Sequence, residues 1–156
     1  NNTIDLESIG HLGFSLGGGV ASLALQKLDI IDAAIGLDGV NHGSVLLKGL
    51  TKPWMIIFSF KKAQDVITYK EVWDKLSNVL TFTIDGARHY NYTDMCMGDF
   101  IRNIPDACGT INEERMSNLL KTYTTAFLNK HLKGIDNNIL VVPPEDYPEI
   151  NNFNVK

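Results

Sequence analysis

Long hydrophobic runs and clusters of basic residues are both missing from this chain of 156 residues. Its longest apolar stretches, around 54–60 and 139–142, are far shorter than the ~20 residues that a membrane-spanning helix needs. Lysine and arginine are scattered and the formal net charge is −4, so there is no basic stripe to neutralise a phosphate backbone. We therefore expect neither a transmembrane segment nor a nucleic-acid partner.

Cysteine is also scarce. Cys96 and Cys108 form neither a zinc pattern nor a CxxC redox motif, and their spacing is compatible with a disulfide or with two buried thiols. Two triplets, 1–3 and 91–93, match the glycosylation acceptor pattern, which often arises by chance. Residues 1–7 show no secretory signal, so the compartment, secreted or cytoplasmic, stays open. No metal or cofactor is expected.

The remaining composition, 44% hydrophobic and 21% charged, is ordinary for one globular domain. Short apolar runs and glycine or proline breaks indicate an alternation of strands and helices. We expect strands at 8–14, 33–37, 53–60 and 79–84, and helices at 20–28, 68–77 and from 110 onward. This order predicts an α/β fold with a mainly parallel sheet flanked by helices.

Capping patterns place two of these helices. A Thr-x-x-Glu box at Thr68 opens the first, and a second box at Thr110 opens the longest helix, which Gly134 ends. The last twenty or so residues are polar and are interpreted as a tail.

The most informative motif is Gly13-Phe14-Ser15-Leu16-Gly17, which matches G-x-S-x-G between a predicted strand and a predicted helix. This context is typical of a nucleophile elbow, a strained turn that needs small residues two positions before and after its serine. Ser15 is the candidate nucleophile. The backbone N–H of Leu16 would supply half of an oxyanion hole. The usual second donor follows an earlier strand, and no such strand precedes residue 8.

A serine nucleophile needs a histidine base, which follows the acid in the chain order of this fold. His89 meets this demand because it comes shortly after the end of the strand 79–84, and catalytic residues collect at the carboxyl ends of parallel strands. His11, inside the first strand, is interpreted as structural. The same holds for His131, near the end of the long helix, where a cation suits the helix dipole.

Two acids compete to orient the histidine. Asp38 directly ends the strand 33–37, whereas Asp65 lies a few residues beyond 53–60 in a segment that could be a solvated helix start. We favour Asp38.

Three further residues are candidates to line a pocket: Phe14, His42 and Met95. His42 precedes most acid candidates, which suits a pocket role better than a catalytic one. Met95 belongs to a cluster with Met97, Phe100 and Ile101. Such a cluster could wall an acyl pocket, but it is more often plain core, and we interpret it as core.

Ser15, Asp38 and His89 lie in segments that resemble the platelet-activating-factor acetylhydrolase family of α/β-hydrolases and, more loosely, the dienelactone-hydrolase-like esterases. The similar segments are 9–21 (IGHLGFSLGGGVA), 33–39 (AAIGLDG) and 84–94 (IDGARHYNYTD), with weaker support from 122–134. The resemblance implies a triad of Ser15, Asp38 and His89 and hydrolysis of a short-chain or phospholipid ester. Phe14 stands where many relatives have histidine.

The resemblance also implies that the chain is the C-terminal portion of a single α/β-hydrolase domain. We expect 8–14 to pair with an N-terminal segment, because an unpaired apolar edge invites aggregation. Two alternatives remain. A serine peptidase or thioesterase of the same fold would use the same triad, and half a hydrolase could instead be a non-catalytic binding or assembly fragment.

Overall fold

The computed structural model of the chain describes residues 4–59, 73–98, 101–143 and 145–156. Five strands form one sheet in the order β1-β2-β3-β4-β5. They are β1 (Gly10–Phe14), β2 (Ala33–Leu37), β3 (Trp54–Ser59), β4 (Val79–Ile84) and β5 (Ile150–Val155). The first four are parallel, and β5 runs antiparallel to β4. The predicted α/β architecture is confirmed, and the four expected strands lie where the apolar runs placed them.

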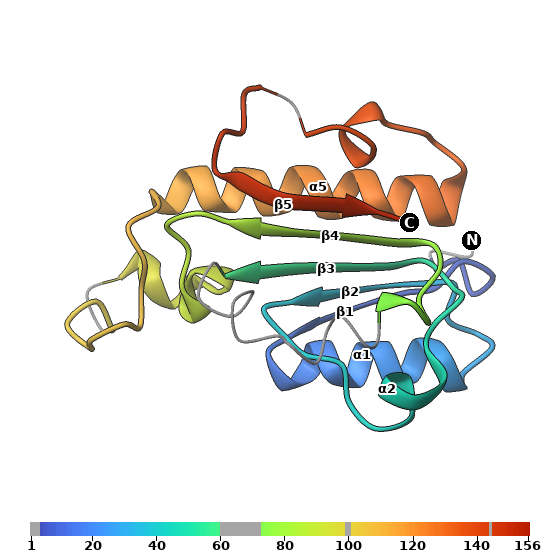
Figure 1. Ribbon diagram of the computed structural model, residues 1–156. Helices are drawn as coiled ribbons and strands as arrows, with labels where there is room; N and C mark the ends of the chain where they lie inside the picture. The colour runs from blue at the N-terminus through green and yellow to red at the C-terminus, as the bar shows by residue number, and fades with distance from the viewer. Residues whose placement is uncertain (1–3, 60–72, 99–100, 144) are drawn as a thin grey trace.

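The central strands are buried on both faces. Every residue of β2, β3 and β4 is buried, which explains their nearly continuous apolar sequences. The two faces carry different helices (Figure 1). One is covered by α1 (Leu16–Lys27) and α2 (Ser44–Lys48), the other by α5 (Glu113–Lys133).

Each face has its own apolar core. On the α1 side, Ala21 and Leu25 pack with Trp54 and Ile56 of β3. On the α5 side the core joins one helix face to the sheet and to the end of the chain: Ile35, Leu37, Met55, Ile57, Phe82, Ile84, Met116, Leu119, Tyr123, Phe127 and Ile150. The helical spacing of the apolar residues in α5 therefore reports its buried face correctly.

The ends of α5 differ in part from expectation. Its N-cap is Asn112, whose side chain accepts a hydrogen bond from the Arg115 N–H at 3.0 Å, so the predicted capping role of Thr110 is wrong. Gly134 ends the helix in the left-handed conformation, as predicted. His131 packs on the Phe127 ring. Burial and the neighbouring Lys130 lower the pKa of His131, which disfavours the cation that the helix dipole would favour.

The C-terminal segment is not a tail. Residues of β5 pair with β4, and Phe153 stacks on Phe82 with ring centroids 5.8 Å apart. Arg115 of α5 donates a hydrogen bond to Glu149, at 2.5 Å, just before the strand. This asparagine-rich edge strand lacks the regular alternation of apolar and polar residues that indicates a strand, so the sequence did not predict it.

Three short 3₁₀ segments complete the description: η1 (His89–Tyr92), η2 (Asp94–Met97) and η3 (Asn138–Leu140). The predicted capping box of the helix 68–77 lies outside the described residues. No helix in the described part of the chain has the length and apolar character needed to cross a membrane.

β1 lies at the edge of the sheet and pairs only with β2 among the described strands. Apolar side chains along this edge are exposed. Leu12 in the strand, Leu16 at the start of α1 and Val20 one turn later are 47%, 70% and 50% exposed. The edge that was expected to pair with an N-terminal segment is therefore apolar, and no second described strand pairs with it.

Candidate active site

Ser15 occupies the sharp turn between β1 and α1 at the carboxyl edge of the sheet. Its φ of 54° is one that non-glycine residues rarely adopt. The Ser15 N–H donates to the Leu37 carbonyl of β2 at 2.8 Å, which fixes the turn against the neighbouring strand. A Cβ on Gly13 would lie 2.0 Å from the Gly17 carbonyl oxygen, so the turn requires glycine there. Such strain commonly persists at functional sites.

The expected need for glycine two positions after the serine is wrong. A Cβ on Gly17 would meet nothing within 4 Å. The residues that need to be small are instead Gly18 and Gly39, because α1 packs closely on the turn that follows β2. A Cβ on Gly39 would lie 2.5 Å from the Ser15 carbonyl oxygen. The turns carrying Ser15 and Asp38 are thus in direct backbone contact.

Asp38 is fully buried at the end of β2, and it also has a positive φ, of 46°. Its Oδ1 accepts a hydrogen bond from the Ser59 N–H at 2.8 Å, and its Oδ2 lies 2.5 Å from Nδ1 of His89. A buried carboxylate is costly unless its oxygens are paired. Here each oxygen has a defined partner, one of which fixes the carboxylate and the other of which is the candidate base.

His89 begins η1, a few residues after β4 ends, and its side chain is 30% exposed. Nδ1 faces Asp38, so Nε2 is the ring nitrogen on the side away from the carboxylate. The imidazole also lies against Phe14, with ring centroids 4.6 Å apart. Since Phe14 adjoins Ser15 in the chain, the structure brings all three predicted triad residues to one edge of the sheet. No hydrogen bond joins the Ser15 hydroxyl to His89 among the described residues.

Leu16 is the first residue of α1. The first N–H groups of a helix have no acceptor within the helix, and the helix dipole makes this end electropositive. The Leu16 N–H is therefore suitably placed in the chain to stabilise an anion next to Ser15.

The pocket candidates differ in their positions. Phe14 contacts the His89 ring, as described. The His42 ring is exposed and covers Gly19, where a Cβ would lie 2.3 Å from its Cδ2 atom. Met95 is 44% exposed, and the core interpretation is wrong for it and for Met97, which is 54% exposed, whereas Ile101 is buried. Asp65, the alternative acid, lies outside the described residues, as does Phe100.

Cys96 and Cys108 form a disulfide, which decides between the two states that the sequence left open. The loop closed by this bond lies against the turn that carries His89, because the Tyr90 N–H donates to the Ala107 carbonyl at 3.3 Å. Sequence reasoning did not connect these two segments.

Asn91 was noticed in the sequence only as part of a glycosylation triplet. In the fold it is 3% exposed, and its side-chain amide donates to Glu113. A glycan at this nitrogen is incompatible with the folded structure. The sequence feature that could have indicated a structural role for Asn91 is its position two residues after His89, the candidate base.

Tyr92, at the end of η1, lies close enough to Asp38 for the carboxylate to influence it. Burial and the Asp38 charge raise the pKa of Tyr92 well above its usual value, so the phenol stays neutral. Its hydroxyl is buried and has no hydrogen-bond partner among the described residues. The ring therefore acts as an apolar wall beside the acid.

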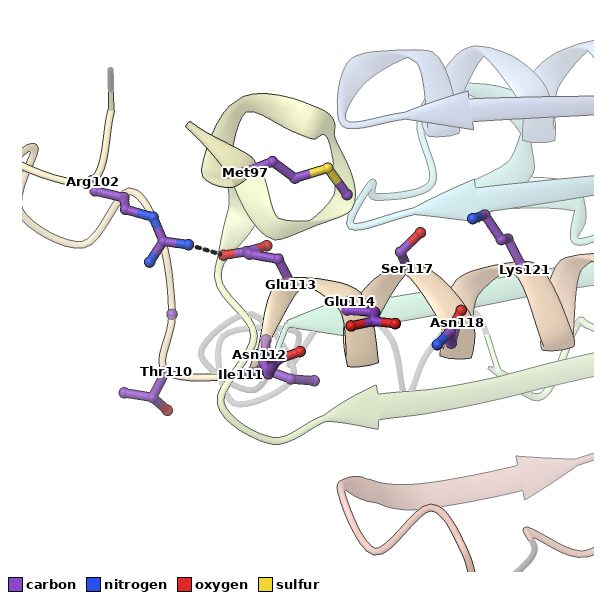
Figure 2. A pocket seen from close by; sticks show the side chains of 11 residues that line it. Met97, Arg102, Thr110, Ile111, Asn112, Glu113, Glu114, Ser117, Asn118 and Lys121 are labelled. Carbon is purple, nitrogen blue, oxygen red and sulfur yellow. Dashed lines mark hydrogen bonds and ion pairs between the residues drawn. The ribbon is translucent and has the colours of Figure 1, made fainter. Parts of the chain in front are cut away.

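Two neighbouring clefts lie between η2 and α5. The larger, of about 860 Å³, includes Met97, Arg102, Glu113 and Lys121 in its lining (Figure 2). The smaller also contacts Leu12 of the open sheet edge. Among the described residues, no cluster of ligating side chains could hold a metal ion.

Residues 1–140 match the family model of platelet-activating factor acetylhydrolase, isoform II. The chain belongs to this family. No curated protein matches it. A solved structure of a ferulic acid esterase from Streptomyces cinnamoneus is similar at a TM-score of 0.83 and 24% sequence identity. The match covers 95% of this chain and 47% of that esterase, so this acetylhydrolase-family chain has the α/β-hydrolase fold and spans about half the length of the esterase.

Proposed function

We propose that the protein containing this chain is a serine hydrolase that cleaves carboxylic esters, with Ser15 as nucleophile, His89 as base and Asp38 as the orienting acid. The observation that carries the proposal is the 2.5 Å contact between His89 Nδ1 and a buried Asp38 carboxylate, beside a serine in a strained strand-to-helix turn. Membership of an acetylhydrolase family supports the same reaction class.

The proposed reaction has two halves. Nε2 of His89 takes the Ser15 hydroxyl proton while Oγ attacks the ester carbonyl, and the Leu16 N–H helps to stabilise the oxyanion. The tetrahedral intermediate collapses, and the alcohol leaves with the proton from His89. Water then attacks the acyl-enzyme, with His89 again serving as base, and releases the acid and free Ser15. Asp38 stabilises the imidazolium in both halves.

The proposed substrates are esters with a short acyl chain, including acetylated or oxidised phospholipids, a preference that rests on the family relationship. Peptides and thioesters would require the same triad. Rates on a p-nitrophenyl acetate to p-nitrophenyl palmitate series, beside a matched amide and thioester, measure this preference.

We further propose that residues 1–156 are the C-terminal portion of a single hydrolase domain, whose remainder covers β1. The exposed edge strand and the apolar Leu12 and Leu16 beside it support this reading. The remainder would also supply the second oxyanion donor.

A fluorophosphonate probe tests the proposed function in the full-length protein. We expect one covalent adduct on the peptide containing Ser15, ester hydrolysis that the probe abolishes, and loss of both after Ser15→Ala. Ser22→Ala is the matched control, because Ser22 is a buried residue of α1 whose hydroxyl donates to the Gly19 carbonyl. A full-length protein that is folded but neither labelled nor active would favour the non-catalytic binding alternative.

A further inference from the structure

Asn91 uses its whole side chain to join three separate segments of the protein. Its Oδ1 accepts two hydrogen bonds, from the N–H groups of Arg88 and Gly109, both at 2.7 Å. Its Nδ2 donates to the two carboxylate oxygens of Glu113, at 3.2 and 3.4 Å. The segments are the turn that carries His89, the chain that leaves the disulfide loop, and the first turn of α5. Among these partners, only Arg88 is adjacent to His89 in the chain.

The surroundings of Asn91 are closely packed. A Cβ on Gly109 would lie 1.8 Å from the Gly86 carbonyl oxygen, and the Ile111 N–H donates to that same carbonyl at 3.1 Å. The Cys96–Cys108 bond ends one residue before Gly109. Movement of the segment 107–111 would therefore move the turn before His89.

Because Glu113 carries a carboxylate, its hydrogen bonds with the Asn91 amide are stronger than bonds between neutral groups. Its side chain is 14% exposed, and it also pairs with Arg102 at 3.3 Å. In Figure 2 its carboxylate points from the start of α5 toward Arg102, beside Met97. Hydrogen bonds to an ionised acceptor are roughly twice as strong as neutral ones. The anion also suits the electropositive start of a helix.

We propose that Asn91 is a positioning residue that holds His89 against Asp38, an inference that rests on the proposed function. The contact it protects, 2.5 Å from Nδ1 to Oδ2, leaves little room for displacement. A shift of about 1 Å in a catalytic geometry can cost about 10²-fold in rate. Asn91 itself touches neither Asp38 nor Ser15 through a hydrogen bond in the described part of the chain, so it acts through the turn alone.

The Asn91→Asp variant tests the hydrogen bonds that Asn91 donates separately from those that it accepts. Aspartate keeps both acceptors for the Arg88 and Gly109 N–H groups but faces Glu113 with a second carboxylate. We expect kcat to fall about 10²-fold while KM changes less than threefold. Glu113→Gln in the same protein supplies a donor to residue 91, so the double variant should regain at least tenfold in kcat. Glu113→Gln alone should lower kcat less than tenfold.

The matched control is Asn118→Asp, the same change on an exposed position of α5, which should leave kcat unaltered. A low-field proton NMR signal of the His89 Nδ1–H provides a readout independent of turnover: Asn91→Asp should weaken it and the double variant should restore it. Folded Asn91→Asp with wild-type kcat and an unchanged signal overturns the inference, as does a loss that Glu113→Gln does not relieve. A wild-type protein without esterase activity, whose signal still responds as described, overturns the proposed function alone.

Discussion

Replacing Asp38 by asparagine changes one atom at the centre of the proposed site. The Ser59 N–H donates to Oδ1 of Asp38 at 2.8 Å inside the core, so the asparagine oxygen must remain there to avoid two facing donors. The amide NH₂ then faces Nδ1 of His89, which has to become an acceptor. The proton moves to Nε2, where the imidazole can no longer take a proton from Ser15.

The size of the effect follows from this change of tautomer. An aspartate-to-asparagine change in a serine-hydrolase triad on another fold lowers kcat by about 10⁴-fold with the geometry intact. The same loss here corresponds to about 5 kcal/mol of transition-state stabilisation. KM should change little, because Asp38 is fully buried and has no surface to offer a substrate.

Steady-state hydrolysis of p-nitrophenyl acetate by the full-length protein measures both constants. Asp85→Asn is the matched control, since Asp85 is exposed and directly follows β4; its kcat should equal that of the wild type. A folded Asp38→Asn variant that keeps more than a tenth of wild-type kcat would refute the orienting role of this carboxylate.

Three further predictions concern stability. Tyr92→Phe removes a buried hydroxyl that has no partner in the described residues, so the free energy of unfolding in urea should stay constant or rise by about 1 kcal/mol, and a clear loss would reveal a hidden partner. The hydrogen bond from Arg115 lowers the pKa of Glu149. The stabilisation of the folded state by this bond is present at neutral pH and is lost as the pH falls through the lowered pKa. Glu149→Gln should therefore flatten the pH dependence of the free energy of unfolding below about pH 4.5, and an unchanged slope would contradict this prediction. Replacing both Cys96 and Cys108 by serine removes the disulfide, and for a closed loop of this size chain entropy predicts a loss of about 3 kcal/mol in the free energy of unfolding. The loss should appear as a lower urea midpoint. An equal midpoint would show that the disulfide does not stabilise the fold.

The sequence predicts the parallel part of the sheet well because the strands are short apolar runs between turn residues. β2 and β3 are fully buried, so hydrophobicity alone marks them. The strand β5 is different: its residues Ile150–Val155 are half asparagine, and its stability depends on pairing with β4 and on the contacts of Phe153. Tertiary pairing of this kind has no local signal.

The same distinction applies to the site. Ser15, Asp38 and His89 could be selected as candidates because each follows a strand that ends at the same edge of the sheet. The roles of Asn91 and Glu113 could not, because they depend on the disulfide loop, which brings Gly109 and the start of α5 against the His89 turn. Contacts between loops are set by distances across space rather than by periodicity along the chain.

The claim that Ser15 and His89 act as one catalytic unit is tested most directly by a double-mutant comparison of kcat in the full-length protein. The account predicts that Ser15→Ala, His89→Ala and the double variant lose activity to the same level within about threefold, since members of a triad are strongly non-additive. Losses that multiply in the double variant would show two independent residues and contradict the account.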